Sequence, residues 1–171
     1  NTLTAELMRL SNYDASVDLA IESCTMTDNV IGASGVLRML ATTGGANLTN
    51  NIIWQPGKTT FEFPGNLLGN LAYRSRYNVT SDIASLPPDP TNRSSDVRFN
   101  DPLIGDWRLR ISSSAVDLAT TSPGAEVDLM GRPRDVLVTP PPNELARDAG
   151  AFERQIEDPY LVNGVFYGSL S

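Results

Sequence analysis

Apolar and polar side chains alternate along short stretches of the first half of the chain, which is the period-two pattern of half-buried β-strands. The alternation is clearest over residues 17–26. Shorter segments of the same kind, most of them separated by Gly, Asn, Asp or Pro, are residues 3–7, 36–41, 48–54, 59–63, 67–73 and 78–83. The one helical turn that we expect lies at residues 143–147. The pattern therefore predicts an all-β protein.

A sequence repeat indicates how these strands are arranged. TDNVI at residues 27–31 aligns with TNNII at residues 49–53 at an offset of 22 (49 minus 27), and YNV at residues 77–79 follows about 27 residues later. Such spacing is typical of the coils of a parallel β-helix, which bury apolar side chains in columns and stack turn residues on one another. We predict that Asn29 and Asn51 are rungs of an asparagine ladder; isolated turn asparagines at the surface are the alternative.

The pattern also divides the chain. We predict coils over residues 1–85, closing strands and loops of the same domain over residues 86–157, and a terminal strand or a linker to a following module over residues 158–171. LPPDPTNRSS at residues 86–95 is predicted to be a surface loop that cannot continue a ladder. Because alternation is present from residue 1, we take the chain to be part of a longer precursor. Upstream coils or another copy of the chain would cover the open strand edges at the N-terminal end.

An ordered set of motifs in the rest of the chain resembles a known family. They are TNNIIW (49–54), YNVTSD (77–82), DPL (101–103), GDWRL (105–109), SAVD (114–117), DLMGRPR (128–134) and DAGAFE (148–153). Together they resemble the C-terminal part of bacterial right-handed parallel β-helix proteins of the choice-of-anchor Q domain family, relatives of the pectate-lyase-like superfamily. Met130, Ser113-Ser114 and Leu118-Ala119 depart from the family's usual residues. The resemblance implies a right-handed parallel β-helix (solenoid) whose C-terminal coils carry capping strands.

The residues in these motifs also support structural predictions of their own. Alternation at Trp107, Leu109 and Ile111 predicts a strand that closes the stack with its apolar side. In the turn over residues 128–133 we expect a positive φ at Gly131. In the DAGAFE motif we expect that Gly150 permits a close backbone approach, that Phe152 enters the core, and that Asp148 pairs with Arg132, Arg134 or Arg147.

Composition narrows the chemistry. A net charge of -7 and a pI near 4.5 disfavour nucleic acid as a partner. The 171 residues include no histidine, which excludes catalytic triads that need histidine and zinc sites that use histidine ligands. The single cysteine, Cys24, is predicted to be a core residue. No apolar run approaches the roughly 18 residues of a membrane span. The low charged fraction of 19% suits a secreted or cell-surface protein.

Five residues are candidate carbohydrate contacts. Trp54 ends an apolar strand and could stack on a sugar ring or plug the coil. Lys58, the only lysine, could serve as a cationic base or clamp a substrate carboxylate, or it is a solvated loop residue. Arg74 and Arg76 share one strand face, with Tyr73 on the other, and could contact an anionic sugar, or they occupy an exposed strand edge.

No cofactor is expected, although calcium stays open because Asp14, Asp18 and Asp28 could supply oxygen ligands. We expect a secreted or surface-displayed β-helix module that binds polysaccharide or cell-surface glycan, or has an adhesive or structural role. The alternative is the C-terminal part of a polysaccharide lyase or glycoside hydrolase with its active site mainly upstream. Carboxylates or basic residues gathered in one groove would favour the enzyme, whereas smooth outer faces of Thr, Asn and Ser would favour the module.

Overall fold

The structure is a computed structural model that describes residues 2–3, 6–10, 18–32, 35–39, 45–62, 72–121, 126–136, 147–155, 160–162 and 165–167. Nearly all of its regular structure is β, and its helical elements are the short 3-10 turns η2 (Ile83–Ser85) and η3 (Pro102–Ile104). The expectation of an all-β protein is confirmed for these residues. The predicted helical turn and most of the predicted strand at residues 67–73 lie outside them.

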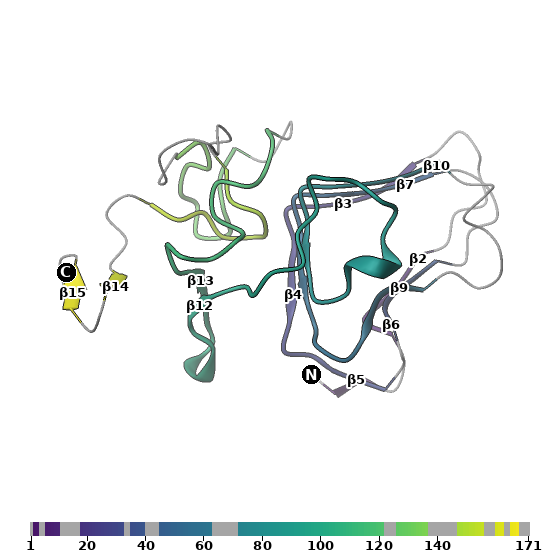
Figure 1. Ribbon diagram of the computed structural model, residues 1–171, viewed down its shortest axis with the longest axis horizontal. Helices are drawn as coiled ribbons and strands as arrows, with labels where there is room; N and C mark the ends of the chain where they lie inside the picture. The colour runs from purple at the N-terminus through teal and green to yellow at the C-terminus, as the bar shows by residue number, and fades with distance from the viewer. Residues whose placement is uncertain are drawn as a thin grey trace.

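Three parallel sheets dominate the first half, and each takes one strand from each of three successive passes of the chain. The first sheet contains β3 (Asp18–Glu22), β7 (Gly45–Thr49) and β10 (Ala72–Arg76), the second β4 (Thr25–Thr27), β8 (Ile52–Trp54) and β11 (Val79–Thr80), and the third β2 (Met8–Leu10), β6 (Gly35–Met39) and β9 (Thr59–Glu62). A further parallel pair joins β1 (Thr2–Leu3) to β5 (Val30–Ile31). The strands of each sheet lie one behind another in Figure 1, an arrangement compatible with the predicted solenoid.

Strand pairing sets the length of one pass in the first two sheets at 27 residues. Ile21 lies beside Leu48, and Leu48 lies beside Ser75, so both steps are 27 (48 minus 21 and 75 minus 48). The predicted offset of 22 is therefore wrong. Thr27 lies beside Trp54 in the second sheet, whereas Thr49 belongs to the first sheet, so these two segments do not stack on each other.

The misalignment has a physical cause, because corners at two different places in the stack adopt the same backbone conformation. Asp28 follows the second-sheet strand β4 with φ 52°, and Asn50 follows the first-sheet strand β7 with φ 61°. Asn and Asp adopt this left-handed conformation more readily than most residues, so both corners have similar sequences. The corners that do stack are Ser23, Asn50 and Tyr77, with φ of 51°, 61° and 55° at intervals of 27.

A ladder of buried asparagines links the passes, and its first two rungs directly follow the corners at Asn50 and Tyr77. Its rungs are Asn51, Asn78 and Asn92, whose side-chain oxygens accept backbone N–H bonds from Cys24 (3.0 Å), Asn51 (3.0 Å) and Asn78 (3.1 Å). Each rung's amide nitrogen donates to a backbone carbonyl of the preceding pass at 2.8 or 2.9 Å. The predicted rung Asn51 is confirmed, but Asn29 is not a rung because its backbone bonds to a glutamine side chain instead.

The Pro-rich segment at residues 86–95 takes part in the stack, contrary to the predicted surface loop. Leu86 is buried in the core, and Asn92 forms the last rung described above. Arg93 adds a parallel bridge beside Val79, with its N–H donating to Asn78 at 2.8 Å. The prolines stand at residues 87, 88 and 90, so they leave the backbone N–H of Arg93 free for the bridge.

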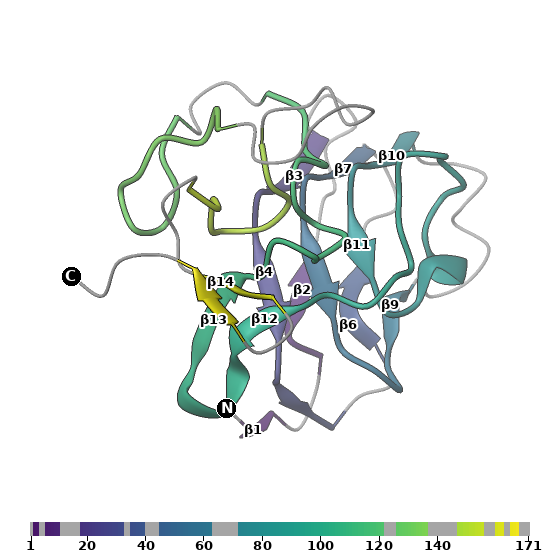
Figure 2. The same ribbon diagram turned by 60° about the vertical axis from the view of Figure 1, so that its left-hand side comes forward.

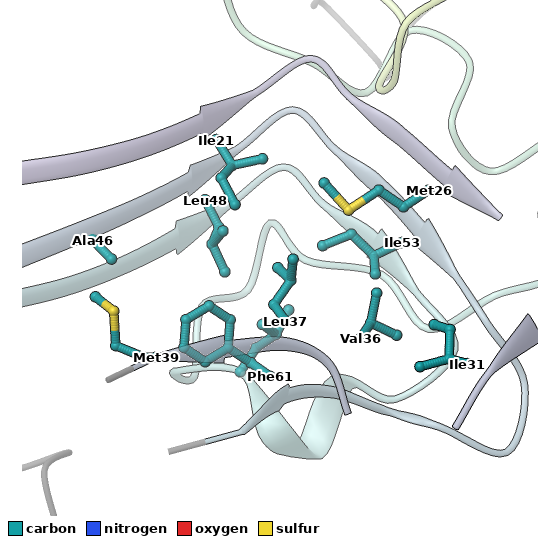
Figure 3. Close-up of a cluster of buried hydrophobic side chains, with 11 residues drawn as sticks. Ile21, Met26, Ile31, Val36, Leu37, Met39, Ala46, Leu48, Ile53 and Phe61 are labelled. Carbon is teal, nitrogen blue, oxygen red and sulfur yellow. The ribbon is translucent and has the colours of Figure 1, made fainter. Parts of the chain in front are cut away.

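Columns of apolar side chains fill the space between the sheets. Ile21 lies over Leu48, and Met26 lies over Ile53, each pair coming from strands in register (Figure 3). Leu37 and Phe61 face them from the third sheet. The predicted inward columns are thus confirmed. Half-buried Cys24 packs against this core, and burial raises the pKa of its thiol, which fits the expected inert core residue.

The second half of the chain packs against the outer face of the second sheet. A second core contains Ile52 and Val79, which point outward from β8 and β11, together with apolar residues between 97 and 149. Asn50 extends this contact, because its amide donates to the Thr120 carbonyl (2.8 Å) and accepts from the Thr120 N–H (3.1 Å). The second sheet is therefore covered on both faces, as Figures 1 and 2 show.

Gly150 meets the same sheet at close range. Its φ is 93°, and a Cβ added there would lie 2.5 Å from Thr25 Oγ1 and 2.7 Å from Ile52 Cδ1, so the predicted close approach is confirmed. Gly131 also has the expected positive φ of 77°. Phe152, however, is only half-buried and belongs to neither core cluster, so its predicted entry into the core is wrong.

Two antiparallel hairpins complete the described fold. β12 (Phe99–Asp101) pairs with β13 (Asp106–Leu109) around η3, and β14 (Tyr160–Val162) pairs with β15 (Val165–Tyr167). The strand at Trp107 therefore pairs with its neighbour in a hairpin and does not close the stack by joining a sheet. Its apolar side nevertheless packs toward the second sheet, because Leu109 and Trp107 contact the second core.

We expect that Asn78→Ala lowers the free energy of unfolding by about 2–3 kcal/mol, because it leaves buried backbone and amide groups on both neighbouring passes without partners. Urea denaturation followed by circular dichroism measures the change. Asn47→Ala is the matched control, because Asn47 lies on β7 outside the ladder, and it should cost about 0.5 kcal/mol or less. Equal costs for the two variants would contradict a structural role for the ladder.

Candidate functional site

A groove lies where the ends of two second-sheet strands face the β12–β13 hairpin. Its volume is about 360 Å³. We call it the aromatic groove, and its lining consists of Thr27, Asp28, Trp54, Gln55, Pro56, Val97, Phe99, Pro102, Leu103 and Trp107. The hairpin lies on the β4 side of the stack in both views of the molecule (Figures 1 and 2).

Strand register explains the first wall. Thr27 and Trp54 are paired neighbours at the ends of β4 and β8. Because side chains alternate along a strand, both point outward, whereas the preceding Met26 and Ile53 point into the main core. Trp54 therefore does not plug the coil. Its half-buried indole rests on the second core and forms part of the groove lining.

Aromatic packing explains the opposite wall. Phe99 and Trp107 meet edge to face, with ring centroids 5.3 Å apart and an interplanar angle of 90°. Phe99 is buried, so it supports the half-buried Trp107 from beneath. Leu103 stands at the rim with 97% of its surface exposed, held by η3 at the hairpin tip. Two indoles from distant parts of the sequence thus line one groove.

The polar edge of the groove comes from the corner after β4. Gln55 is fixed by two bonds to the backbone of Asn29, accepting at 3.2 Å and donating at 2.6 Å. Asp28 directly precedes Asn29, has the left-handed backbone conformation and is exposed. Among the described residues, its carboxylate has no ion pair or side-chain hydrogen bond. The groove therefore combines apolar ring faces with one unengaged carboxylate.

The structure places the five predicted contacts in different parts of the fold. Only Trp54 lines the groove. Lys58 lies in the turn after it, with its N–H donating to the Gln55 carbonyl at 3.1 Å. Arg74 and Arg76 are exposed on the same face of β10 in the first sheet, and Arg76 lies 3.4 Å from an Asp89 carboxylate oxygen.

Tyr73 lies in β10 beside Arg74, and its side chain is outside the described part. Sequence reasoning did not identify Trp107 or Phe99 as groove residues. The sequence signal that could have indicated the hairpin is Gly105, because a glycine suits the positive φ of 80° at the end of η3, between the two short strands. The hairpin pattern does not tell which surface its aromatic residues will meet.

A second cluster of charged groups lies inside the C-terminal half. Asp148 accepts backbone N–H bonds from Asp117 (2.8 Å) and Arg154 (2.7 Å), and its own N–H donates to Glu153 (3.0 Å). Arg134 donates to the Asp148 carbonyl at 2.9 Å. The predicted pairing of the Asp148 carboxylate with an arginine is therefore wrong, because backbone N–H groups occupy it.

The other two arginines that were expected to pair with Asp148 have different partners. Arg132 bonds to Asp128 at 2.9 Å, and Arg147 bonds to Asp135 at 2.5 Å. Asp128 also accepts backbone N–H bonds from Met130 and Arg132, as the predicted turn requires. These contacts fasten the last described loops to one another.

Burial controls the protonation of this cluster. Desolvation raises the pKa of Asp148 to about 7. Desolvation and the neighbouring Asp148 charge raise the pKa of Glu153 to about 9. Both residues are fully buried, and Glu153 Oε1 has no hydrogen-bond partner among the described residues. A raised pKa is typical of a catalytic acid, but here no substrate can reach the carboxyl groups.

Two further features, metal-ligating groups and membrane-spanning helices, concern the part of the chain that the structure describes. No group of three or more acidic or thiol side chains there is placed to hold a metal ion. Asp14 lies outside that part, so nothing there tests the calcium site that the sequence leaves open beside the expectation of no cofactor. No helix among the described residues is long and apolar enough to cross a membrane. Comparison with protein-family models, curated proteins and solved structures found no match.

We expect the free energy of unfolding to fall as the pH rises from about 5 to 9. The pKa values of Asp148 and Glu153 are raised in the folded state, so their stabilising protonated forms are fully present below the unfolded pKa near 4 and are lost as pH rises through about 7 and 9. Urea denaturation at several pH values should show a loss of about 1 kcal/mol or more.

Glu153→Gln keeps the shape of the side chain and removes its titration, so the decline should become shallower. Glu22→Gln, at an exposed position of β3 outside this cluster, is the control for replacing a carboxyl group by an amide. A slope that Glu153→Gln does not alter would show that the carboxyl group of Glu153 does not govern stability in this range.

Proposed function

We propose that this chain is a secreted or surface-displayed right-handed parallel β-helix module that binds carbohydrate in the aromatic groove. Three parallel sheets with a 27-residue repeat support the solenoid, together with a continuous asparagine ladder. The motif resemblance to the choice-of-anchor Q domain family supports a bacterial protein that is secreted or displayed at the cell surface.

The observation that carries carbohydrate binding is the pair of half-buried indoles, Trp54 and Trp107, in one groove with polar side chains at its edge. An indole offers a flat apolar face and an N–H donor. A pyranose ring offers a matching C–H face with hydroxyl groups around it. Both indoles rest on the second core, so their orientation is set before a ligand arrives, which lowers the entropic cost of binding.

Geometry favours binding over hydrolysis at this groove. A glycosidase needs two carboxyl groups about 5–10 Å apart across the scissile bond. Asp28 is the one carboxylate among the described residues that line the groove. The pair Asp148 and Glu153 is fully buried, so it cannot serve as those carboxyl groups. An active site in upstream coils remains the alternative function of a longer protein.

We expect Trp54→Ala to weaken glycan binding by about tenfold or more, because a central aromatic contact is lost. A glycan array identifies a ligand, and calorimetry with that ligand measures the affinity. Trp54→Phe keeps a ring in the groove and should retain part of the affinity. Thermal unfolding of each variant distinguishes lost contact from lost fold.

Leu129→Ala is the matched control, because Leu129 is also an apolar residue at the surface, 71% exposed, but does not line the groove. It should bind as the unmodified protein does. If no glycan binds the folded protein, the carbohydrate proposal is wrong. If a glycan binds and Trp54→Ala has no effect, the binding surface lies elsewhere.

A further inference from the structure

The charge around the aromatic groove narrows the kind of sugar that it would accept. Among the described residues that line it, Asp28 is the only charged one. The basic residues that sequence reasoning offered for an anionic sugar, Arg74 and Arg76, lie on the first sheet, and Lys58 does not line the groove. No positive charge is therefore present in the described lining to neutralise a carboxylate or sulfate group on a ligand.

On the hairpin wall, Arg108 is held by Asp106 through two bonds of 2.8 Å, so its charge is already paired. Arg98 and Arg110, which flank the hairpin strands, are exposed but do not line the groove, and they donate to Ser112 (3.3 Å) and to the Asn100 carbonyl (2.7 Å). Asp101 lies next to the lining residue Pro102, and its carboxylate accepts the Leu103 N–H at 3.2 Å, which places a second negative charge near the rim. The net charge of -7 repels anionic polymers at longer range.

We infer that the aromatic groove binds uncharged oligosaccharides and that Asp28 is the specificity residue that rejects uronate and sulfated sugars. This inference rests on the proposed function. The Asp28 carboxylate accepts hydrogen bonds from sugar hydroxyl groups, and it repels a ligand carboxylate by Coulomb interaction. The volume of about 360 Å³ is near the lower end of the usual ligand-pocket range of about 300–1,000 Å³, so the groove holds a short stretch of a chain.

The conformation of Asp28 provides a clean test of this role. Its φ of 52° is one that asparagine adopts readily, so Asp28→Asn removes the charge and preserves the corner. Glu22→Gln is the matched control, because Glu22 is exposed on the first-sheet strand β3, lies outside the groove lining and changes the net charge by the same amount. Any general effect of net charge should then be equal in the two variants.

The experiment measures affinity for pairs of neutral hexasaccharides and their C6-oxidised uronate counterparts, using calorimetry at low ionic strength. The unmodified protein should prefer the neutral member of a pair. Asp28→Asn should reduce that preference by about threefold to fivefold, the effect of one exposed charge at contact distance, and Glu22→Gln should not. Added salt should also reduce the preference, because it screens the repulsion.

The outcomes separate this inference from the proposal on which it rests. Binding that Trp54→Ala abolishes, but that favours the uronate or ignores Asp28→Asn, would keep carbohydrate binding and overturn the rejection of anionic sugars by Asp28. Absence of binding to both members of every pair by the folded protein would overturn both. A neutral preference that only Asp28→Asn reduces would support both.

Discussion

The hydrogen bonds of the Asn51, Asn78 and Asn92 side chains are the contacts on which the rest of the structure depends. Each side-chain oxygen accepts a backbone N–H bond from the preceding pass, and each side-chain nitrogen donates to a backbone carbonyl of that same pass. All three amide groups therefore point the same way along the stack. Aligned amide dipoles strengthen one another in a low-dielectric interior. Because the rungs Asn51 and Asn78 directly follow the left-handed corners at Asn50 and Tyr77, the ladder fixes where these corners lie and therefore which strands become neighbours.

Burial of the second sheet on both faces follows from that register. Its inward residues fill the main core, and its outward residues Ile52 and Val79 form the base of the second core. Asn50 and Gly150 fasten the C-terminal half at this face, one through a pair of bonds to Thr120 and the other through a backbone approach that no side chain would permit. The aromatic groove is the edge of the same contact, where the hairpin extends past the strand ends.

Much of the coil arrangement could be predicted from local pattern, because alternation identifies strands and the inward residues of a stack are apolar wherever the register falls. The register itself could not. The corners at Asp28 and Asn50 have nearly the same sequence because they have the same backbone conformation, and a five-residue match cannot tell one corner from the other. The rung at Asn92 could not be predicted either, because it is made by a side chain within a proline-rich segment that shows no strand pattern.

The groove was predicted only in part. Trp54 stands out at the end of an apolar strand, but the second wall depends on how a hairpin packs against a sheet far away in sequence. Thr27 and Trp107 are 80 positions apart (107 minus 27), and both line the groove. During synthesis the first wall emerges before the second, so the aromatic groove exists only after the β12–β13 hairpin has been made. The coils alone, however well folded, carry one wall of it.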